Sequence, residues 1–404
     1  MKIVVLKFGG TSVGSIDRIK KVADLIIKYV KKKYKVIVVS SAMSGDTNNL
    51  VNKSKKISNN FSDEEYDVLV SSGEQVACSL IAGTLIDKGY KSRSWMGWQI
   101  PIITDDKHRY SKINQVFKNN IIRYLKSDGI PIITGFQGIN KKNRITTIGR
   151  GGSDSSAIIL AKFFKAERCI IYTDVEGVYT TDPKKLDKAK KIKVISYEEM
   201  LEMASLGAKV MQPVSIQDAR LSRIDIEVKS TFKNKSGTLI TKRKNIINRN
   251  IITGISSTQN DAKVTLVGIK DKPGIAASIF KPLSESSINV DMVVQNISAD
   301  GKETDLTFTI KNDDLNKTKK IINSNKKINY KKLLFDKNVS KVSIIGVGMI
   351  TTPGVTYRMF QALANNKINI QVISTSEIKI SVLINKKNIN KAINALHKEF
   401  KLEK

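Results

Sequence analysis

A lysine followed closely by two glycines ends the first short apolar run of this chain. Residues 3–6 are aliphatic and mostly β-branched, which indicates a strand that carries Lys7 at its tip. Gly9 and Gly10 let the backbone turn with its N–H groups exposed, an arrangement that holds phosphate oxygens. Ser15 then precedes an amphipathic helical pattern and is expected to cap it. Together these elements predict a phosphate-binding turn with a cation beside it.

The order of these elements excludes two other phosphate-binding loops. In a Walker A loop the lysine follows the glycines and precedes the helix, whereas here it stands before them. The G-x-G-x-x-G pattern of protein kinases does not occur in this stretch either. A strand that simply ends in a Gly-Gly turn remains the alternative, and this run alone does not decide between the two.

A second glycine cluster supports the phosphate interpretation. Residues 149–156 (Gly-Arg-Gly-Gly-Ser-Asp-Ser-Ser) follow a β-type run at 145–148 and precede an apolar helical segment at 157–164. Glycines again open a helix, and Arg150 supplies a fork-shaped donor for a carboxylate or a phosphate. Asp154 lies in the first helical turn, where a carboxylate is also expected for its interaction with the helix dipole.

Residues 2–241 alternate short apolar runs with helical patterns. This alternation predicts an α/β domain around a mainly parallel sheet, with ligands at the carboxyl ends of the strands. A helix is expected over residues 62–88, with a capping box formed by Ser62 and Glu65 and an interruption near Gly73. Further strands are predicted at residues 36–40, 101–104, 130–134, 169–173 and 224–229.

A polar, basic stretch at residues 242–250 is followed by an internal repeat. Residues 263–268 (Lys-Val-Thr-Leu-Val-Gly) resemble residues 341–346 (Lys-Val-Ser-Ile-Ile-Gly). Each copy continues with a Pro-Gly pair, a helical segment and an Ile-Asn pair, and Gly274 and Gly354 both stand 15 residues before that asparagine. Strand, helix, strand, strand and helix, twice over, predict two modules of ferredoxin-like topology.

These motifs, taken in order, resemble the aspartate kinases of the amino-acid kinase superfamily, and the repeat resembles that family's paired ACT domains. The matching segments are residues 7–12, 41–43, 72–74, 149–156, 172–179 and, in the second ACT module, 373–381. The resemblance implies an α/β fold, an amino-acid-kinase αβα sandwich with a mainly parallel sheet, followed by two ferredoxin-like ACT α+β modules. It implies a catalytic domain at 1–245, a first ACT domain at 246–335 and a second at 336–404, the last sharing a strand at 251–257.

The same resemblance implies ATP-dependent phosphorylation of the β-carboxylate of L-aspartate, the first step toward lysine, threonine and methionine, with feedback by lysine, threonine or both. A carboxylate acceptor is already ionised at neutral pH, because its reference pKa is about 3.9, so no general base is needed. The only histidines, His108 and His397, lie outside the glycine clusters. We interpret His108 as structural or on the surface, and the same observation disfavours a Ser-His hydrolase.

The resemblance also assigns roles residue by residue. Lys7, Asp154 and Lys209 are the expected catalytic residues, with Lys7 on the transferred phosphate and Asp154 orienting either that lysine or a magnesium-bound water. The ATP site would consist of Lys7, Phe8, Gly9, Gly10, Thr173, Asp174, Tyr179, Lys184 and Lys209. The aspartate site would consist of Ser41, Thr47, Glu74, Arg150 and Ser153. Glu74 would pair with the substrate ammonium, and Arg150 with its α-carboxylate.

For the tail, the resemblance implies amino-acid effector sites and a homodimer or larger homo-oligomer formed through the ACT modules. The expected effector residues are Asp271, Gly274, Ala276, Asn289, Asp291, Gln295, Asn369, Ile370 and Ser376. Magnesium is expected to arrive with ATP, since no cluster of histidines and cysteines implies a dedicated metal site. Two positions depart from the family pattern, because Lys184 replaces an arginine and Asn48 an aspartate.

The formal charge of +32 raises the question of nucleic-acid binding. The 12 arginines and 57 lysines are spread along the whole chain, so we expect no specific nucleic acid but a field that attracts ATP. No apolar run approaches the roughly 20 residues that span a bilayer, which predicts no membrane partner. The two cysteines are far apart in the sequence and the first strand begins at residue 2, which together predict a cytoplasmic protein.

Three alternatives stay open. A kinase of the glutamate or acetylglutamate type, or one acting on a nucleoside monophosphate, would share the glycine loops but not the paired tail. A noncatalytic ACT sensor of amino acids would not need intact Lys7, Glu74 and Arg150. A nucleic-acid binder depends on charge alone.

Overall fold

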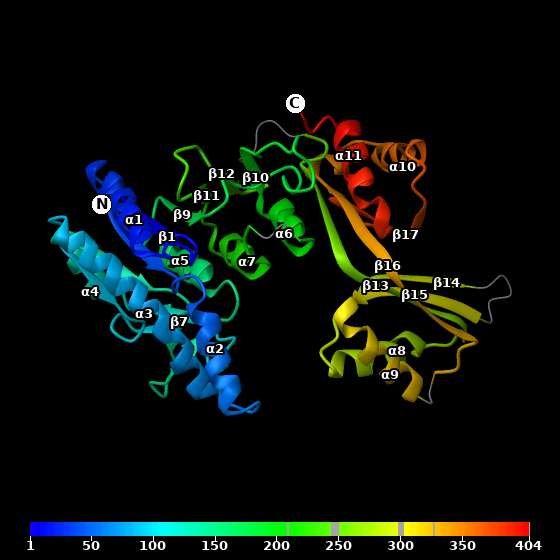
Figure 1. Cartoon of the computed structure of the whole chain (residues 1–404), viewed down its shortest axis with the longest axis horizontal. Helices are drawn as coiled ribbons and strands as arrows, with labels where there is room; N and C mark the ends of the chain where they lie inside the picture. The colour runs from blue at the N-terminus through cyan, green and yellow to red at the C-terminus, as the bar shows by residue number, and fades with distance from the viewer. Residues whose placement is uncertain (208–209, 244–249, 298–302, 326–327, 404) are drawn as a thin grey trace. The chain divides into compact units, whose positions relative to one another are not determined.

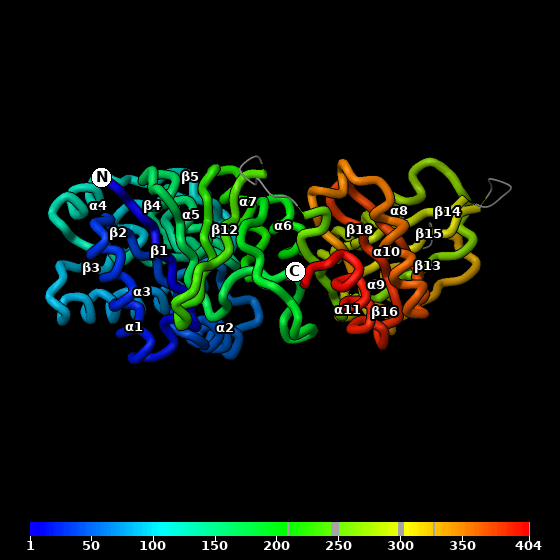
Figure 2. The backbone as a smooth tube through the Cα atoms, turned by 90° about the horizontal axis from the view of Figure 1, so that it is seen from above, coloured from blue at the N-terminus to red at the C-terminus, as the bar shows by residue number. Residues whose placement is uncertain are grey.

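The computed structural model spans residues 1–404 and describes all of them except 208–209, 244–249, 298–302, 326–327 and 404. The chain forms two compact units, whose backbones can be followed in Figures 1 and 2. The first unit consists of Met1–Val178, Lys191–Ser205 and Lys209–Ile247. The second consists of Tyr179–Lys190, Leu206–Ala208 and Asn248–Lys404, so it includes two short excursions from the middle of the chain.

The first unit is organised around an eight-stranded sheet in the order β10-β12-β11-β9-β1-β2-β6-β3. Its central strands are β1 (Ile3–Phe8), β2 (Lys35–Ser40), β6 (Ile130–Thr134) and β9 (Arg168–Thr173), and they run parallel. The outer strands are β3 (Ser92–Trp95), β10 (Val194–Ser196), β11 (Ile226–Ser230) and β12 (Thr238–Thr241), with β11 and β12 antiparallel. The mainly parallel sheet predicted from the alternating pattern is confirmed.

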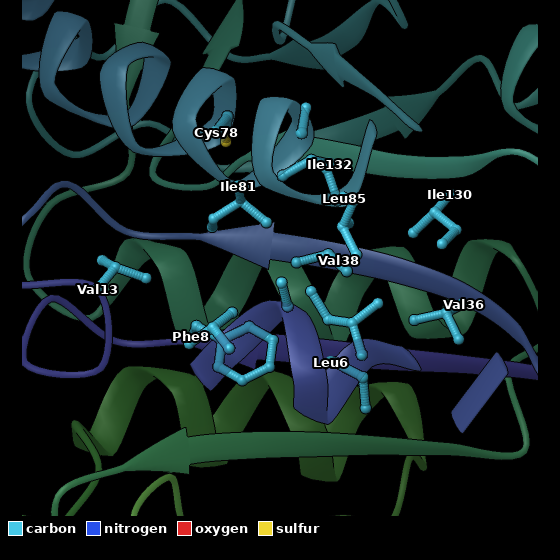
Figure 3. Packing of buried hydrophobic residues seen from close by; sticks show 14 of the residues in the cluster. Leu6, Phe8, Val13, Val36, Val38, Cys78, Ile81, Leu85, Ile130 and Ile132 are labelled. Carbon is cyan, nitrogen blue, oxygen red and sulfur yellow. The ribbon is translucent and has the colours of Figure 1, made fainter. Parts of the chain in front are cut away.

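Helices cover both faces of this sheet. α1 (Ile16–Lys31) and α3 (Asp63–Asp87) pack over the face that carries Leu6 and Phe8 (Figure 3). α5 (Gly152–Phe163) packs against β1 from the opposite side, toward which the intervening Lys7 points. The unit also contains α2 (Asp46–Ile57), α4 (Asn119–Lys126), α6 (Tyr197–Ser205) and α7 (Pro213–Ser222). This arrangement is the αβα sandwich that was expected.

Local sequence explains where α1 begins but not where α3 begins. The Ser15 hydroxyl accepts a hydrogen bond of 3.3 Å from a backbone N–H in the first turn of α1, as predicted. The capping box predicted for α3 is wrong, because the Ser62 side chain accepts no capping hydrogen bond and Glu65 forms an ion pair with Arg144. α3 is also continuous through Gly73, which serves close packing: a Cβ there would lie 2.8 Å from that of Ala42.

Within the described part of the chain, α3 is the one helix long and apolar enough to cross a membrane by length and composition. The expectation that no apolar run approaches this length is therefore wrong for α3. Half of the apolar window is buried, and Cys78, Ile81 and Leu85 lie in the core cluster against β1 and β2 (Figure 3). This is the placement of a core helix in a globular domain.

A second, four-stranded sheet in the same unit has the order β5-β4-β7-β8. Its strands are β4 (Ile102–Thr104), β5 (Ile113–Val116), β7 (Gln137–Ile139) and β8 (Ile145–Thr147). β8 leads directly into the second glycine cluster and then α5, so this sheet determines where Arg150 stands. The loop between β4 and β5 returns past the end of β8, where Ser111 N donates to Thr147 O at 2.9 Å.

The second unit contains the internal repeat in one six-stranded sheet of order β14-β15-β13-β16-β18-β17. The first copy is β13 (Gly254–Lys270), α8 (Ile275–Glu285), β14 (Asp291–Ile297), β15 (Glu303–Lys311) and α9 (Leu315–Ser324). The second is β16 (Lys332–Ile345), α10 (Val355–Asn365), β17 (Ile370–Thr375), β18 (Lys379–Asn385) and α11 (Ile389–Glu399). Both copies follow the order strand, helix, strand, strand, helix that the sequence predicts.

β13 is one continuous strand of 17 residues, whereas the sequence predicted a strand at 251–257 and a separate one from residue 263. Its first part pairs with the second copy, with Ser256 opposite Ser343, and its later part pairs with β15 of the first copy. Pairing on both sides outweighs the weak strand propensity of the polar residues between the two parts.

The excursion Tyr179–Lys190 is held in the second unit by buried polar contacts. Thr180 O accepts from Ile255 N at 2.7 Å, and Thr180 Oγ1 lies 2.9 Å from His397 Nε2. His397, a residue of α11, is fully buried. The histidine is therefore part of the packing that fixes this segment.

Candidate active site

Loops meet at the carboxyl ends of the central strands of the first unit. Phe8 of β1 stands opposite Ser40 of β2 and Tyr172 of β9. Gly9 N donates to Tyr172 O at 3.2 Å, and Ser41 N donates to Phe8 O at 3.0 Å. The predicted phosphate-binding turn therefore leaves the sheet beside the segments that follow β2 and β9.

Close packing at this edge requires glycine at three positions. A Cβ at Gly10 would lie 2.9 Å from Ala42 O, and one at Gly73 would lie 2.8 Å from the Ala42 Cβ. A Cβ at Gly135 would come equally close, 2.8 Å, to that of Ser153. Side chains at these positions would push apart the phosphate-binding turn, the loop after β2, α3 and the start of α5. The glycines thus hold the predicted substrate residues together.

Lys7 and Asp154 form a buried ion pair. Lys7 Nζ lies 2.6 Å from Asp154 Oδ1, and both residues are only 8% exposed. Strand alternation turns Lys7 away from the core cluster and toward the first turn of α5, where Asp154 lies. A Cβ at Gly9 would lie 3.3 Å from this Nζ, so the ammonium sits next to the turn. The carboxylate holds a positive charge in a defined direction beside the predicted phosphate position.

Glu74 is a buried carboxyl group with one oxygen available. Its Oε1 accepts a hydrogen bond from Ala42 N at 3.0 Å, whereas Oε2 has no partner among the described residues. Burial, and to a smaller extent the charge of Asp46, raises the pKa of Glu74 to about 8. A buried carboxylate oxygen without a donor is costly in free energy unless a ligand supplies one. Glu74 is therefore suited to a cationic ligand.

The other predicted aspartate-site residues surround the same edge. Ser41 follows β2 and is half-buried, Thr47 lies in the first turn of α2, and Ser153 is buried at the start of α5. Arg150 is exposed on the turn before α5. Burial raises the pKa of the Tyr66 phenol, a shift that the charge of Arg109 and, to a smaller extent, that of Arg150 oppose.

The predicted nucleotide residues are divided between the units. Thr173 and Asp174 follow β9 in the first unit, where Thr173 Oγ1 donates to Asp174 Oδ1 at 3.0 Å. Tyr179 and Lys184 belong to the excursion in the second unit, and Lys184 is exposed. Lys209 lies outside the described residues. The first unit thus contains the predicted phosphate-binding turn, the Lys7–Asp154 ion pair and the predicted aspartate-site residues.

The predicted effector residues all lie in the second unit. Asp271, Gly274 and Ala276 surround the start of α8; Asn289, Asp291 and Gln295 lie before or in β14; Asn369, Ile370 and Ser376 lie before, in and after β17. Asp291 is ion-paired with the buried Lys341. Burial favours the neutral acid, but the hydrogen bond and charge of Lys341 prevail and hold the pKa of Asp291 below its usual value.

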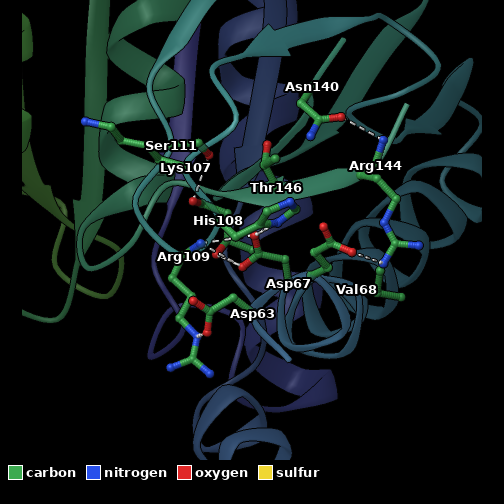
Figure 4. Close-up of polar contacts among 12 residues, drawn as sticks. Asp63, Asp67, Val68, Lys107, His108, Arg109, Ser111, Asn140, Arg144 and Thr146 are labelled. Atoms are coloured by element: carbon green, nitrogen blue, oxygen red, sulfur yellow. Dashed lines mark hydrogen bonds and ion pairs between the residues drawn. The ribbon is translucent and has the colours of Figure 1, made fainter. Parts of the chain in front are cut away.

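Sequence reasoning missed Asp67 and gave His108 no specific role. Asp67 is fully buried and lies seven residues, two helical turns, before Glu74 in α3. Its carboxylate accepts hydrogen bonds from His108 Nδ1 and Arg109 N (Figure 4). It also accepts one from Thr147 Oγ1. The available signal was a second carboxylate on the face of α3 that carries Glu74.

Comparison with known proteins places both units in families. The sequence profile of the amino acid kinase family matches residues 2–230, and that of the ACT domain matches residues 264–325 and 342–400. The chain is 44% identical over 405 residues to an aspartate kinase of Stutzerimonas stutzeri, covering 100% of this chain and 98% of that protein. It is 43% identical over 402 residues to an aspartokinase of Geobacillus stearothermophilus, with the same coverage.

Solved structures agree with these matches. Aspartokinase III of E. coli in complex with aspartate and ADP gives a TM-score of 0.79 at 25% identity, covering 98% of this chain and 99% of that one. The same protein in complex with lysine and aspartate gives a TM-score of 0.81 at 25% identity, covering 99% and 100%. Sequence and structure therefore point to one assignment over the whole chain.

Proposed function

The chain belongs to the aspartate kinases of the amino acid kinase family, and we propose that it phosphorylates the β-carboxylate of L-aspartate with ATP. The product would be 4-phospho-L-aspartate, the first intermediate toward lysine, threonine and methionine. The observation that supports this most directly is the partnerless Glu74 Oε2, a buried acceptor in the unit that carries the Lys7–Asp154 pair. An amino-acid substrate supplies the ammonium that this oxygen lacks.

Aspartate would be recognised through its ammonium and its α-carboxylate, each bound by a side chain of opposite charge. The substrate ammonium would donate to Glu74 Oε2 and balance the buried carboxylate. Arg150 would hold the α-carboxylate by a bidentate contact. Ser41, Thr47 and Ser153 would complete the pocket as neutral hydrogen-bonding groups. With the α-carbon held at two points, the β-carboxylate is left to face the γ-phosphate.

Phosphoryl transfer would depend on Lys7 and the phosphate-binding turn. Charge spreads over the phosphoryl oxygens in the transition state, and the Lys7 ammonium with the N–H groups of Gly9 and Gly10 would stabilise it. Asp154 would act through Lys7, by holding its ammonium in place. The proposed ATP residues are those predicted from the sequence: Lys7, Phe8, Gly9, Gly10, Thr173, Asp174, Tyr179, Lys184 and Lys209.

Magnesium would enter with ATP. In the described ranges, no group of three or more His, Cys, Asp or Glu side chains is placed to hold a metal ion. Asp154, the carboxylate next to the proposed phosphate position, is already paired with Lys7. Phosphate oxygens and water would therefore supply most of the ligands, which is how Mg²⁺ often binds. Once bound, it would neutralise phosphate charge.

A hydroxamate assay tests the substrate assignment. Hydroxylamine traps an acyl phosphate, so purified protein with ATP should form a hydroxamate from aspartate but not from glutamate or N-acetylglutamate. In the same assay Arg150→Lys should raise the KM for aspartate and leave the KM for ATP unchanged. The single ammonium group of lysine cannot reproduce the bidentate contact of a guanidinium with a carboxylate. A change confined to ATP would reassign Arg150 to phosphate, and preference for glutamate would overturn the assignment.

Feedback inhibition by lysine, threonine or both is the second part of the proposal. It is supported by the two ACT modules and by the likeness to an aspartokinase crystallised with lysine. An effector inhibits only if it binds better to a less active arrangement, typically by about 1–3 kcal/mol. The modules would also form a homodimer or larger oligomer. The competing possibility is that they serve assembly alone.

A further inference from the structure

One buried carboxylate of the first unit has no part in the chemistry proposed above. Asp67 is fully buried, and its two oxygens accept from three donor groups, of which Figure 4 labels His108 and Arg109. His108 Nδ1 lies 2.8 Å from Oδ2, Arg109 N lies 3.0 and 3.1 Å from the two oxygens, and Thr147 Oγ1 lies 2.5 Å from Oδ1. These donors come from the β4–β5 loop and from the end of β8. Asp67 therefore clamps two separate segments to α3.

Both clamped segments lead toward Arg150. Thr147 is the last residue of β8, and the chain reaches Arg150 shortly afterwards. The β4–β5 loop is joined to the same point, because Ser111 N and Oγ each donate to Thr147 O at 2.9 Å. Displacement of the loop would therefore also displace the start of the second glycine cluster.

The same loop forms a wall against Gly149. A Cβ at Gly149 would lie 3.0 Å from both Arg109 O and Tyr110 Cδ1, and its φ of +82° favours glycine as well. Arg109 itself has a φ of 66°, a left-handed conformation that costs free energy in a non-glycine residue. Asp67 offsets that cost by accepting from Arg109 N, and Asp63 Oδ1 holds the guanidinium Nε at 2.7 Å.

We propose that Asp67 is a positioning residue for aspartate recognition: it fixes the direction in which Arg150 leaves the glycine cluster. The inference rests on the proposed function, in which Arg150 holds the substrate α-carboxylate. Asp67 and Glu74 lie two turns apart on α3, so this helix would determine the position of both substrate-binding charges. A bidentate contact depends on orientation, so a small rotation of the arginine lowers affinity.

Asp67→Asn keeps the size of the side chain and removes its charge. We expect the KM for aspartate to rise tenfold or more, while the KM for ATP and kcat at saturating aspartate change less than threefold. Asp225→Asn is the matched control: Asp225 accepts from Thr241 Oγ1 at 2.7 Å but precedes β11, at the opposite ends of the strands. That variant should leave both KM values unchanged.

A second variant and a double variant keep the test decisive. His108→Ala removes one donor to Asp67 and should also raise the aspartate KM, by a smaller factor than Asp67→Asn. If Asp67→Asn does not fold, the KM of His108→Ala tests the positioning role instead. In an Arg150→Ala background, Asp67→Asn should add less than twofold, because the clamp acts through Arg150.

The outcomes distinguish the positioning role of Asp67 from the role of Arg150 in the proposed function. If Arg150→Ala raises the aspartate KM but folded Asp67→Asn does not, or if the two effects multiply, the positioning role is overturned while the proposed function stands. If Arg150→Ala leaves the aspartate KM unchanged, the role of Arg150 in the proposed function fails, and the inference about Asp67 fails with it.

Discussion

The Lys7 ammonium lies 2.6 Å from the Asp154 carboxylate, where the tip of β1 meets the first turn of α5. The two residues belong to different glycine clusters that lie far apart in the sequence. Removing one partner of a buried pair leaves the other charge without compensation. The pair therefore couples the proposed phosphate site to the stability of the first unit, and variants can separate the two effects.

Lys7→Met should lower phosphoryl transfer about 100-fold or more and lower the melting temperature. Loss of a donor to developing charge typically costs about 3 kcal/mol of barrier, or about 100-fold in turnover. Adding Asp154→Asn removes the uncompensated charge, so the double variant should recover most of the melting temperature but none of the activity. Turnover and thermal unfolding measure the two effects.

Lys35→Met provides the matched control for that experiment. Lys35 begins the neighbouring strand β2 and pairs with Asp128, which is 87% exposed. Exposed pairs contribute little, so this variant should retain both turnover and melting temperature. Near wild-type turnover in a folded Lys7→Met protein would contradict the catalytic role of Lys7.

Glu74 predicts a pH dependence of aspartate binding. Its pKa of about 8 means that the free protein carries the neutral acid at pH 7, whereas pairing with the substrate ammonium requires the carboxylate. The KM for aspartate should therefore fall by up to tenfold per pH unit as the pH rises toward 8, and then level off. The KM for ATP should not follow this profile. Glu74→Gln should raise the aspartate KM and remove the pH dependence; an unchanged profile would contradict the proposed contact.

Glu74 also predicts a pH dependence of stability. In the unfolded chain its pKa returns to an ordinary value of 4.5, so between pH 4.5 and about 8 only the folded state holds the proton. The free energy of unfolding should consequently decrease with rising pH in this window, by at most about 1.4 kcal/mol per pH unit from this group. Urea denaturation of wild type and Glu74→Gln at several pH values isolates the contribution. If the free energy of unfolding of the two proteins changes with pH in parallel, Glu74 does not keep its proton in the folded state.

The two glycine clusters and the parallel sheet could be predicted because their signals are local. Strands at residues 36–40 and 130–134 follow from short runs of mostly apolar residues, and Gly129 and Gly135 flank the second run. β13 was predicted as two strands because its continuity depends on pairing with β15 and β16, which are distant in the sequence. The clamp at Asp67 escaped prediction for a similar reason, since tertiary structure alone brings its donors to α3.

If the proposed effector sites are correct, variants at them should lose inhibition but keep activity. Gln295 is exposed on β14, an edge strand of the six-stranded sheet, and Ser376 lies in the turn after β17, at the other edge. Gln295→Ala removes a polar contact to an amino-acid effector and Ser376→Phe blocks the second site, so each should relieve inhibition by lysine and threonine without lowering basal turnover. Gln259→Ala, at an exposed position of β13, is the matched control and should remain inhibited.

Thermal unfolding in the presence of each effector distinguishes binding of the amino acid from its effect on turnover. A ligand that binds the folded state must raise the melting temperature, whether or not it inhibits. A shift without inhibition would mean that the ACT modules bind the amino acid but do not act on the kinase unit. If saturating lysine plus threonine changes neither the turnover nor the melting temperature of the wild type, the modules serve assembly, because an effector without differential affinity cannot shift an equilibrium.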